Sequence, residues 1–366
     1  MNDVQDRRWM QRAIELGRQA RYWSAPNPPV GCVLVRDDHE IGAGFTQPAG
    51  QAHAEIMALN DSGDANGASA YVTLEPCSHH GQTGPCASAL VDAGVARVVV
   101  AVEDPNPQVA GSGIAALRAK GIDVALGEGA GQVEADLAGF LLRMRRGYGR
   151  ITLKIAMSLD GRTAMPSGES QWITGEDARA DVQRLRAESD LMVTGVGTVL
   201  ADDCRLTLRA DELPLDGEDK DRALAHPPVR MVLDSKGRTP ASARILAGGE
   251  TTLITTENIA LGESDQAVLL GADAEGRVDI GAWVQYLGEQ AFNEILVEAG
   301  ATLSGALLEG GWVDRLIIYQ APKLLGDAAR AMAAVNFPAL ADAPEFEINE
   351  VTRIGADLRI IAAPKG

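Results

Sequence analysis

The residues best able to do chemistry lie in two short segments, HAEIMALN beginning at His53 and EPCSHHGQTGPC over residues 75–86. Together they contain the imidazole of His53 and the thiols of Cys77 and Cys86. Zinc in proteins takes imidazole and thiolate ligands, and a catalytic zinc keeps one of its four positions open for water. His53, Cys77 and Cys86 would supply three ligands and leave that position open. The segments therefore predict a catalytic zinc site.

Glu55 lies two residues after His53 and could be a free carboxylate at this site. Residues two apart inside a helix point to nearly opposite sides, so the two can share a site only if His53 stands at the first turn. A carboxylate there could take a proton from an activated water and pass it to a leaving group. Zinc deaminases carry His-x-Glu followed by Pro-Cys-x-x-Cys, and their glutamate is not a ligand. Glu55 is thus the candidate catalytic residue, although eight residues separate the two cysteines here.

Two other interpretations of these cysteines stay open at this point. They could be unconnected core residues, or a structural zinc could take His79 or His80 as its fourth ligand. Four cysteines in 366 residues do not form a disulfide framework. Cys32, inside VGCVLV, is expected to be a small buried apolar residue, and Cys204 has no evident partner.

The surrounding segments alternate between helical and strand-like patterns. Helices are expected over 6–21, 53–63, 85–94 and 113–121, and strands within 26–36, 68–77, 95–107 and 122–127. This alternation predicts a mainly parallel sheet covered on both faces. Ligands of such sheets bind beyond the carboxyl ends of the strands, where Cys77 and the loop EDPNP are expected.

A chain of this length favours two domains, and the short basic segment RMRRGYGR suggests a boundary that gives domains 1–146 and 147–366. The second half is again α/β, with a polar stretch, 211–228, expected to be a surface loop. It lacks a Gly-x-Gly-x-x-Gly fingerprint. Its segments VEAGATLSGALLEGG and TGVGTVLADD each place glycines before a helix. Such turns either offer N–H groups to a phosphate or pack tightly, and both interpretations stay open.

The formal net charge of −18 argues against a nucleic-acid partner, because nucleic-acid binding depends on basic surface. A small anionic substrate is compatible with it, since a few arginines can reverse the field locally. We find no secretory signal and no apolar run long enough to cross a bilayer, so a cytoplasmic protein without a membrane partner is expected.

Over nearly its whole length the chain resembles the bifunctional deaminase–reductase family of riboflavin biosynthesis. The resemblance rests on PNPPVGCVLV, HAE, TLEPCSHHGQTGPC, EDPNPQVAGSG, LKIAMSLDGRTAMPSGESQWITG, TVLADD and VEAGATLSGALL, in this order. The long spacing of the cysteines is typical of this family. The resemblance implies a cytidine-deaminase-like α/β/α domain followed by a dihydrofolate-reductase-like α/β domain. It also implies two reactions on a phosphorylated pyrimidine, hydrolytic deamination with Zn²⁺ and then reduction of the ribosyl group to ribityl with NADPH.

The resemblance also assigns residues. In the first domain it implies zinc ligands His53, Cys77 and Cys86, the proton shuttle Glu55 and a pyrimidine contact from Asn27. Less firmly it adds a pocket lining of His79, Gln82, Asp104 and Asn106. In the second domain it implies cofactor contacts from Ala156, Trp172, Thr198, Asp202, Ser235, Gly300, Ala301, Thr302, Leu303, Ser304, Gly305 and Ala306. The implied substrate contacts there are Ser170, Arg186, Leu206, Arg209 and Glu298.

Several roles in the second domain stay open. Arg186 and Arg209 are sensible phosphate clamps, because guanidinium binds phosphate through two parallel hydrogen bonds. Lys236 or Arg238 could hold the 2′-phosphate that distinguishes NADPH from NADH. The group that assists hydride transfer could be Lys154, Asp202 or Glu298.

Three positions depart from the family pattern. Gln82 stands where relatives commonly have a basic residue, which puts a substrate-phosphate contact there in question. Gly84 and Cys204 each replace a usual proline. By analogy the protein would be a homo-oligomer. The alternatives are a deaminase whose second domain is catalytically silent, and a zinc-containing nucleic-acid binding or editing module.

Overall fold

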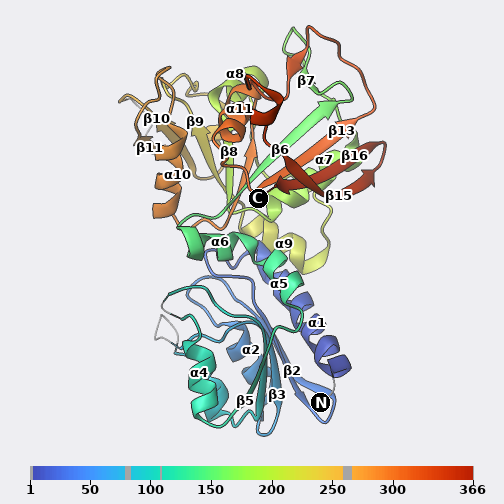
Figure 1. Ribbon diagram of the computed structural model, residues 1–366, viewed down its shortest axis with the longest axis vertical. Helices are drawn as coiled ribbons and strands as arrows, with labels where there is room; N and C mark the ends of the chain where they lie inside the picture. Colours follow the sequence, from blue (N-terminus) through green and yellow to red (C-terminus); the bar gives the residue numbers. More distant parts are fainter. Residues whose placement is uncertain (1–2, 79–83, 108, 259–265, 366) are drawn as a thin grey trace. The chain divides into compact units, whose positions relative to one another are not determined.

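The computed structural model describes residues 3–78, 84–107, 109–258 and 266–365 (Figure 1). The chain divides into two compact units, Met1–Gly147 and Tyr148–Gly366, and each contains its own sheet and hydrophobic core. Both are α/β, as predicted. His79, His80 and Gln82, which the sequence analysis considered, lie outside the described residues. None of the described helices has the length and apolar character needed to cross a membrane.

The first unit is built on one five-stranded sheet in the order β2-β1-β3-β4-β5. β3, β4 and β5 are parallel neighbours, whereas β1 is antiparallel to both β2 and β3. The elements in chain order are α1 (Asp3–Gln19), β1 (Gly31–Arg36), β2 (His39–Phe45), α2 (Ala54–Ser62), β3 (Ser69–Leu74), α3 (Cys86–Asp92), β4 (Arg97–Val102), α4 (Ser112–Ala119), β5 (Asp123–Leu126), α5 (Ala130–Asp136) and α6 (Ala138–Arg146), with a 3-10 turn at Ala20–Tyr22.

The prediction of a mainly parallel sheet holds for β3, β4 and β5 but misses the antiparallel strand β1, which forms a hairpin with β2. Asp37 and Asp38, the only residues between the paired ends of the two strands, have φ angles of 52° and 60°. Positive φ at both central residues is what a two-residue hairpin turn requires, and Asp adopts it more readily than most residues. The sequence analysis did not recognise this turn or the strand that follows it.

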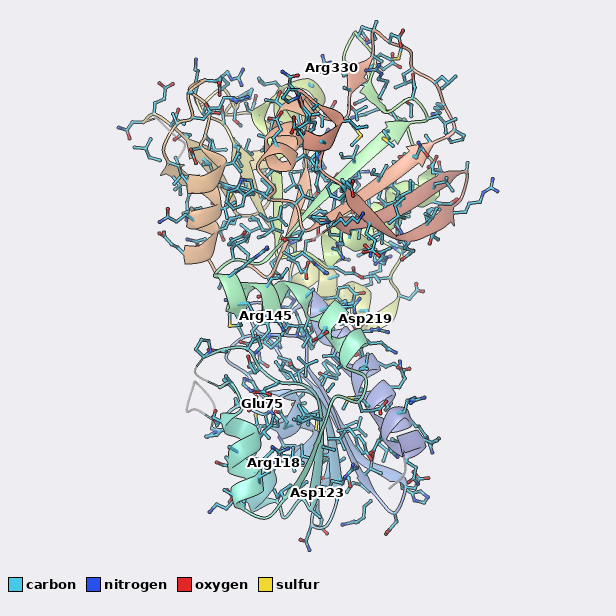
Figure 2. All side chains as sticks on the ribbon, in the orientation of Figure 1. Glu75, Arg118, Asp123, Arg145, Asp219 and Arg330 are labelled. Carbon is cyan, nitrogen blue, oxygen red and sulfur yellow. The ribbon has the colours of Figure 1, made fainter. Side chains whose placement is uncertain are left out.

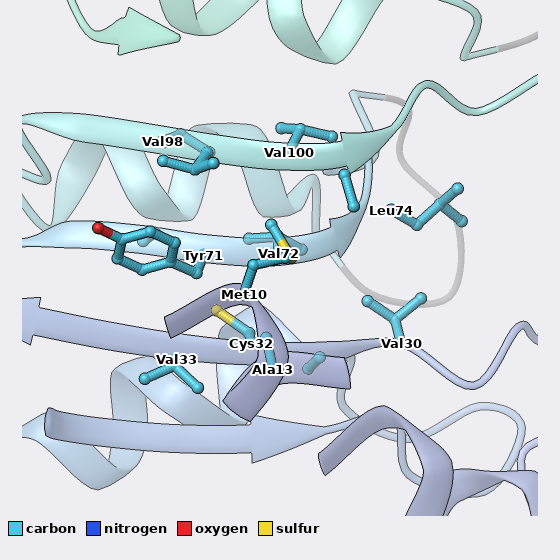
Figure 3. Close-up of a cluster of buried hydrophobic side chains, with 14 of the residues drawn as sticks. Met10, Ala13, Val30, Cys32, Val33, Tyr71, Val72, Leu74, Val98 and Val100 are labelled. Carbon is cyan, nitrogen blue, oxygen red and sulfur yellow. The ribbon is translucent and has the colours of Figure 1, made fainter. Parts of the chain in front are cut away.

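Helices cover both faces of this sheet, which gives the predicted α/β/α layering. A Cβ atom on Gly31 would lie 1.9 Å from the carbonyl oxygen of Ala13, so α1 lies directly on that face of β1. Gly44 pairs with Cys32, the next residue of β1, and its Cβ would lie 2.5 Å from the carbonyl oxygen of Ala54 in α2. Successive strand residues point to opposite faces, so α1 and α2 lie on opposite sides. Figure 3 shows α1 side chains against β1 and β3 in the core.

The second unit is built on a nine-stranded sheet in the order β11-β10-β9-β8-β12-β6-β13-β16-β15. From β11 to β13 all neighbours are parallel, and β16 and β15 add an antiparallel edge. A small separate sheet pairs β7 with β14. The elements are β6 (Arg150–Ser158), β7 (Arg162–Ala164), α7 (Glu176–Ala187), β8 (Leu191–Gly195), α8 (Val196–Asp202), α9 (Gly217–Ala225), β9 (Val229–Leu233), β10 (Thr251–Thr255), β11 (Gln266–Leu269), α10 (Ile280–Glu289), β12 (Glu294–Glu298), α11 (Ala301–Glu309), β13 (Arg315–Ala321), β14 (Arg330–Ala331), β15 (Phe346–Ile354) and β16 (Asp357–Pro364), with 3-10 turns at Arg244–Leu246 and Leu340–Asp342.

The polar stretch 211–228 is not all loop, because α9 occupies its centre. Glu218 and Asp219 lie in the first turn of α9, where negative charge is favourable, and both pair with Arg222. The polarity of the stretch concealed a helix that these local ion pairs stabilise.

Candidate metal centre and cofactor cavity

The three predicted zinc ligands come together in the first unit. His53 Nδ1 lies 3.7 Å from Cys77 Sγ and 3.4 Å from Cys86 Sγ. The three potential ligand atoms all lie within 4.8 Å of one another. Bonds of about 2.3 Å to sulfur and 2.0–2.1 Å to nitrogen in a tetrahedral site put nitrogen and sulfur about 3.5 Å apart. The donor set therefore fits a zinc ion with one position left for another ligand.

The local structure explains why these side chains meet. His53 is the N-cap of α2, with an extended backbone (ψ 166°), so its predicted place at the beginning of a helix is confirmed. Cys86 is the first residue of α3 and follows Pro85. Cys77 lies three residues beyond β3, and the backbone N–H of Cys86 donates to its Sγ over 3.4 Å. The ligands thus come from a strand end and two helix beginnings.

The protonation of the two thiols also favours a cation. The hydrogen bond with Cys86, helped by His53 and opposed by burial, lowers the pKa of Cys77 to about 4. The same hydrogen bond, together with burial, raises the pKa of Cys86. One of the two thiols is therefore readily deprotonated, and a positive ion between the sulfurs favours deprotonation of the other. A divalent metal would supply this positive charge.

Glu55 is buried beside the ligands, with 4% of its surface exposed. Burial raises the pKa of this carboxyl group to about 7. A carboxyl group that changes protonation near neutral pH can both accept and deliver a proton. Glu55 thus lies next to the ligand set, and its role as proton shuttle stays a prediction.

Two further predicted residues lie at the same edge of the sheet. The backbone N–H of Gly31, at the start of β1, donates to Thr73 Oγ1 near the end of β3, so the loop before β1 lies beside the end of β3. That loop contains Asn27, which is half-buried and whose backbone N–H donates to the carbonyl of Ser24. Asp104 follows β4, the parallel neighbour of β3, and is buried.

The remaining cysteines behave differently. Cys32 is fully buried in β1, which confirms the expectation of a small core residue, whereas Cys204 is half-buried in the second unit. Gly84 is one of the three departures from the family pattern, and none of the described atoms lies within 4 Å of the place where its Cβ atom would stand.

In the second unit a cavity of about 1120 Å³ gathers most of the predicted cofactor and substrate residues. Its lining includes Ala156, Ser170, Trp172, Arg186, Thr198, Asp202, Leu206, Arg209, Ser235, Glu298, Gly300, Ala301, Thr302, Leu303 and Ala306. Ser304 and Gly305 are not among its described lining residues. Ser304 is fully buried with its hydroxyl directed to the carbonyl of Ala299, and a Cβ on Gly305 would lie 2.1 Å from the carbonyl oxygen of Ala334. Both residues serve packing of α11.

Arg186 does not have the geometry of a phosphate clamp. Its Nε lies 2.6 Å from Glu298 Oε1, its Nη2 lies 3.1 Å from Oε2, and its Nη1 donates to the carbonyl of Thr207. Lys154 Nζ lies 3.4 Å from Glu298 Oε2. Burial alone would raise the pKa of Glu298, but the charges and hydrogen bonds of Arg186 and Lys154 lower it to about 2. Arg186 is therefore placed to hold Glu298 rather than to reach a phosphate.

Several other polar residues of the cavity remain accessible to a ligand. Arg209 pairs with Glu212 but has 39% of its side chain exposed, and Asp202 Oδ1 accepts a hydrogen bond from Ser170. Arg238 is exposed and lines the cavity, whereas Lys236 is not among its lining residues. Arg244 also lines it and is exposed. Arg244 could not be predicted as a cavity residue from the sequence, because no motif surrounds it.

The metal centre and the cavity define a zinc deaminase domain joined to a reductase domain, and comparisons with known proteins agree. Residues 3–102 match the family model described as the cytidine and deoxycytidylate deaminase zinc-binding region, and residues 150–360 match that of the RibD C-terminal domain.

Full-length relatives match the whole chain. The riboflavin biosynthesis protein RibD of Escherichia coli (strain K12) is 48% identical over 365 residues, which cover 97% of this chain and 98% of that protein. The structure of Acinetobacter baumannii RibD, form 1, is 44% identical with a TM-score of 0.92 and covers all of both chains. A diaminohydroxyphosphoribosylaminopyrimidine deaminase/5-amino-6-(5-phosphoribosylamino)uracil reductase from Thermotoga maritima is 29% identical with a TM-score of 0.88 over 99% of both chains. The chain belongs to the RibD family of bifunctional deaminase–reductases of riboflavin biosynthesis.

Proposed function

We propose that the chain carries out two successive reactions on a phosphorylated pyrimidine. Residues 1–146 would hydrolytically deaminate 2,5-diamino-6-(5-phospho-ribosylamino)pyrimidin-4(3H)-one. Residues 147–366 would then reduce the ribosyl group of 5-amino-6-(5-phosphoribosylamino)uracil to ribityl with NADPH. The observation that carries this proposal is the presence, in one chain of this family, of a complete zinc ligand set beside Glu55 and of a large cavity around an ordered Lys154–Glu298–Arg186 cluster.

In the deaminase site, a zinc ion held by His53, Cys77 and Cys86 would supply Lewis-acid activation of water. Glu55 would take the proton of the attacking water and deliver it to the departing amine. Its buried position keeps the carboxyl pKa near 7, where accepting and delivering a proton are both favourable. Asn27, at the same sheet edge, would contact the pyrimidine ring.

In the reductase site, the bound nicotinamide would supply the hydride. The cofactor would lie along the beginning of α11 from Gly300 to Leu303, where backbone N–H groups at a helix N-terminus favour phosphate. Exposed Arg238 would meet the 2′-phosphate of NADPH, because it lines the cavity and Lys236 does not. Arg209 would contact the substrate phosphate.

Among the three ionisable groups at the reductase site, we assign proton delivery to Lys154. Glu298, with a pKa of about 2, has no proton to give at neutral pH, and Asp202 accepts a hydrogen bond from Ser170. Lys154 lines the cavity, and its Nζ donates a hydrogen bond to Glu298 Oε2 over 3.4 Å. An ammonium group there can neutralise the alkoxide that forms when hydride reaches the sugar carbon.

We further propose that the protein is cytoplasmic and forms homo-oligomers, as folds of these classes usually do. Neither property enters the two reactions described above. Sedimentation of the purified protein would test the oligomeric state.

One assay tests the proposed function as a whole. The protein is given the diaminopyrimidine ribosyl phosphate, ammonia release is followed first, and oxidation of NADPH is followed second. Both signals are expected, in that order. Ammonia without NADPH oxidation would mean that the second unit is catalytically silent, and the absence of both would refute the proposed reactions.

A further inference from the structure

Glu75 is a buried carboxylate that the two reactions above do not use. It directly follows β3, lies two residues before Cys77 and is 3% exposed. Figure 2 shows it beside the beginning of α4, and four backbone N–H groups donate to it. A glutamate satisfied by four main-chain donors from a distant part of the chain is a specific arrangement, since most buried carboxylates pair with cationic side chains.

The four donors belong to the two ends of the β4–α4 connection. Oε2 accepts from Asp104 N over 3.2 Å and from Gly111 N over 3.0 Å. Oε1 accepts from Gly113 N over 2.9 Å and from Ile114 N over 3.1 Å. The Glu75 side chain therefore holds the two ends of the β4–α4 connection together. It also binds N–H groups in the first turn of α4, which have no partner within the helix.

Further contacts hold the same two segments together. A Cβ atom on Gly113 would lie only 2.0 Å from the carbonyl oxygen of Pro76, so α4 lies directly on the chain that leads to Cys77. Ser78 Oγ and Ser112 Oγ are 2.6 Å apart. The segment that carries the ligand Cys77 is thus joined to the segment that carries Asp104, and Glu75 makes most of the hydrogen bonds between them.

We infer that Glu75 is a positioning residue of the deaminase site: it fixes the β4–α4 connection, and Asp104 with it, against the zinc-binding segment. It does not touch the metal ligands' donor atoms or Glu55 through any hydrogen bond among the described residues. Its removal should therefore misplace Asp104 and the beginning of α4, and leave the zinc ligands and the proton shuttle in place. This inference rests on the proposed deamination.

The test compares Glu75→Gln with Glu103→Gln. We call Glu75 and the four backbone N–H groups that it binds the Glu75 clamp. An amide at position 75 keeps one oxygen as an acceptor and turns an NH₂ group toward the other pair of N–H groups, so this clamp loses half of its acceptors. Glu103 is the exposed residue that follows β4, and it makes no hydrogen bond among the described residues. Its carboxylate lies beside Gly111, and glutamine has the same size, so the same change there leaves the four hydrogen bonds to Glu75 intact. Deaminase KM and kcat, bound zinc, and reductase kcat on the deaminated substrate are measured for both variants and for the unmodified protein.

For Glu75→Gln we expect a rise of at least about tenfold in deaminase KM, a smaller change in kcat, one zinc per chain and unchanged reduction. A displacement of about 1 Å in a group that positions substrate can cost about 100-fold. Glu103→Gln should match the unmodified protein. An unchanged deaminase KM in Glu75→Gln would overturn the inference, and so would loss of zinc together with kcat. Inactivity of the unmodified protein would instead refute the proposed function.

If Glu75→Gln does not fold, Gly113→Ala tests the same contact while keeping the glutamate itself. Its Cβ must displace the carbonyl of Pro76 or α4, so the two segments separate. It should give the same selective rise in deaminase KM with zinc retained. A folded Gly113→Ala protein with normal deaminase KM would overturn the inference.

Discussion

Replacing Arg186 with Met should destabilise the second unit by about 3 kcal/mol at neutral pH. The variant keeps an unbranched apolar stem in the buried position and removes the charge that holds Glu298. Against burial, which would raise it, Arg186 and Lys154 together hold the pKa of Glu298 at about 2 instead of the usual 4.5. This interval corresponds to about 3 kcal/mol of folding free energy, and Arg186, which makes two hydrogen bonds to the carboxylate, is its main source. Loss of one partner of a buried ion pair costs about 3–5 kcal/mol in general, which agrees with this figure.

The pH dependence of this effect has a definite sign. Folding lowers the pKa of Glu298, so the ionised form is favoured by folding, and its stabilisation is complete above about pH 4.5 and disappears as pH falls toward 2. The difference between the unmodified protein and Arg186→Met should therefore be largest at pH 7 and shrink below pH 4.5.

Urea unfolding followed by tryptophan fluorescence measures these free energies, with Lys365→Met as the control. Lys365 and Glu345 form a pair of similar length, 2.9 Å, but both are largely exposed, so that change should cost less than about 1 kcal/mol. Adding Glu298→Gln to Arg186→Met should restore part of the lost stability, because the buried carboxylate that Arg186 neutralises is then replaced by an uncharged amide. A loss below about 1 kcal/mol at pH 7, or a loss that does not change with pH, would refute this account of the cluster.

Three other outcomes are expected. Removal of zinc with a chelator should abolish deamination and leave reduction of the deaminated substrate intact; parallel loss of both rates would contradict two separate sites. Arg238→Ala should raise the KM for NADPH much more than that for NADH, whereas Lys236→Ala should not, and equal effects on both cofactors would remove Arg238 from the 2′-phosphate site. Gly31→Ala should destabilise the first unit by at least about 3 kcal/mol, because its Cβ meets the backbone of Ala13, while Gly131→Ala in α5, where the space is open, should be neutral or stabilising; similar urea midpoints for the two would contradict the α1–β1 contact.

The zinc site could be predicted from the sequence because its chemistry is local. A histidine at a helix beginning and a cysteine after Pro85 are visible as residue types at characteristic places, and the structure brings His53, Cys77 and Cys86 together as expected. Glu75 lies in the same segment but was missed. Nothing in its own neighbourhood shows that its partners begin 29 residues further along the chain.

In the reductase cavity, too, the partners of a residue lie far from it in the sequence and could not be predicted. Glu298 stands opposite Lys154 because β12 and β6 are parallel neighbours, and Arg186 reaches it from α7, 112 residues away. The sequence alone does not show which residues of neighbouring strands stand side by side. It therefore offered no reason to prefer Glu298 over a substrate phosphate as the partner of Arg186. The β1–β2 hairpin was missed for a different reason: Asp-Asp is a less distinctive turn signal than Asn-Gly or Asp-Gly.

The most direct test of the two-site account uses Glu55→Gln, a variant that keeps the size of the side chain and removes its ability to shuttle a proton. With the diaminopyrimidine ribosyl phosphate it should release no ammonia, although it should bind one zinc per chain. With the deaminated substrate it should oxidise NADPH at the rate of the unmodified protein. Ammonia release at the normal rate would remove Glu55 from the mechanism, and loss of NADPH oxidation as well would contradict two independent sites in one chain.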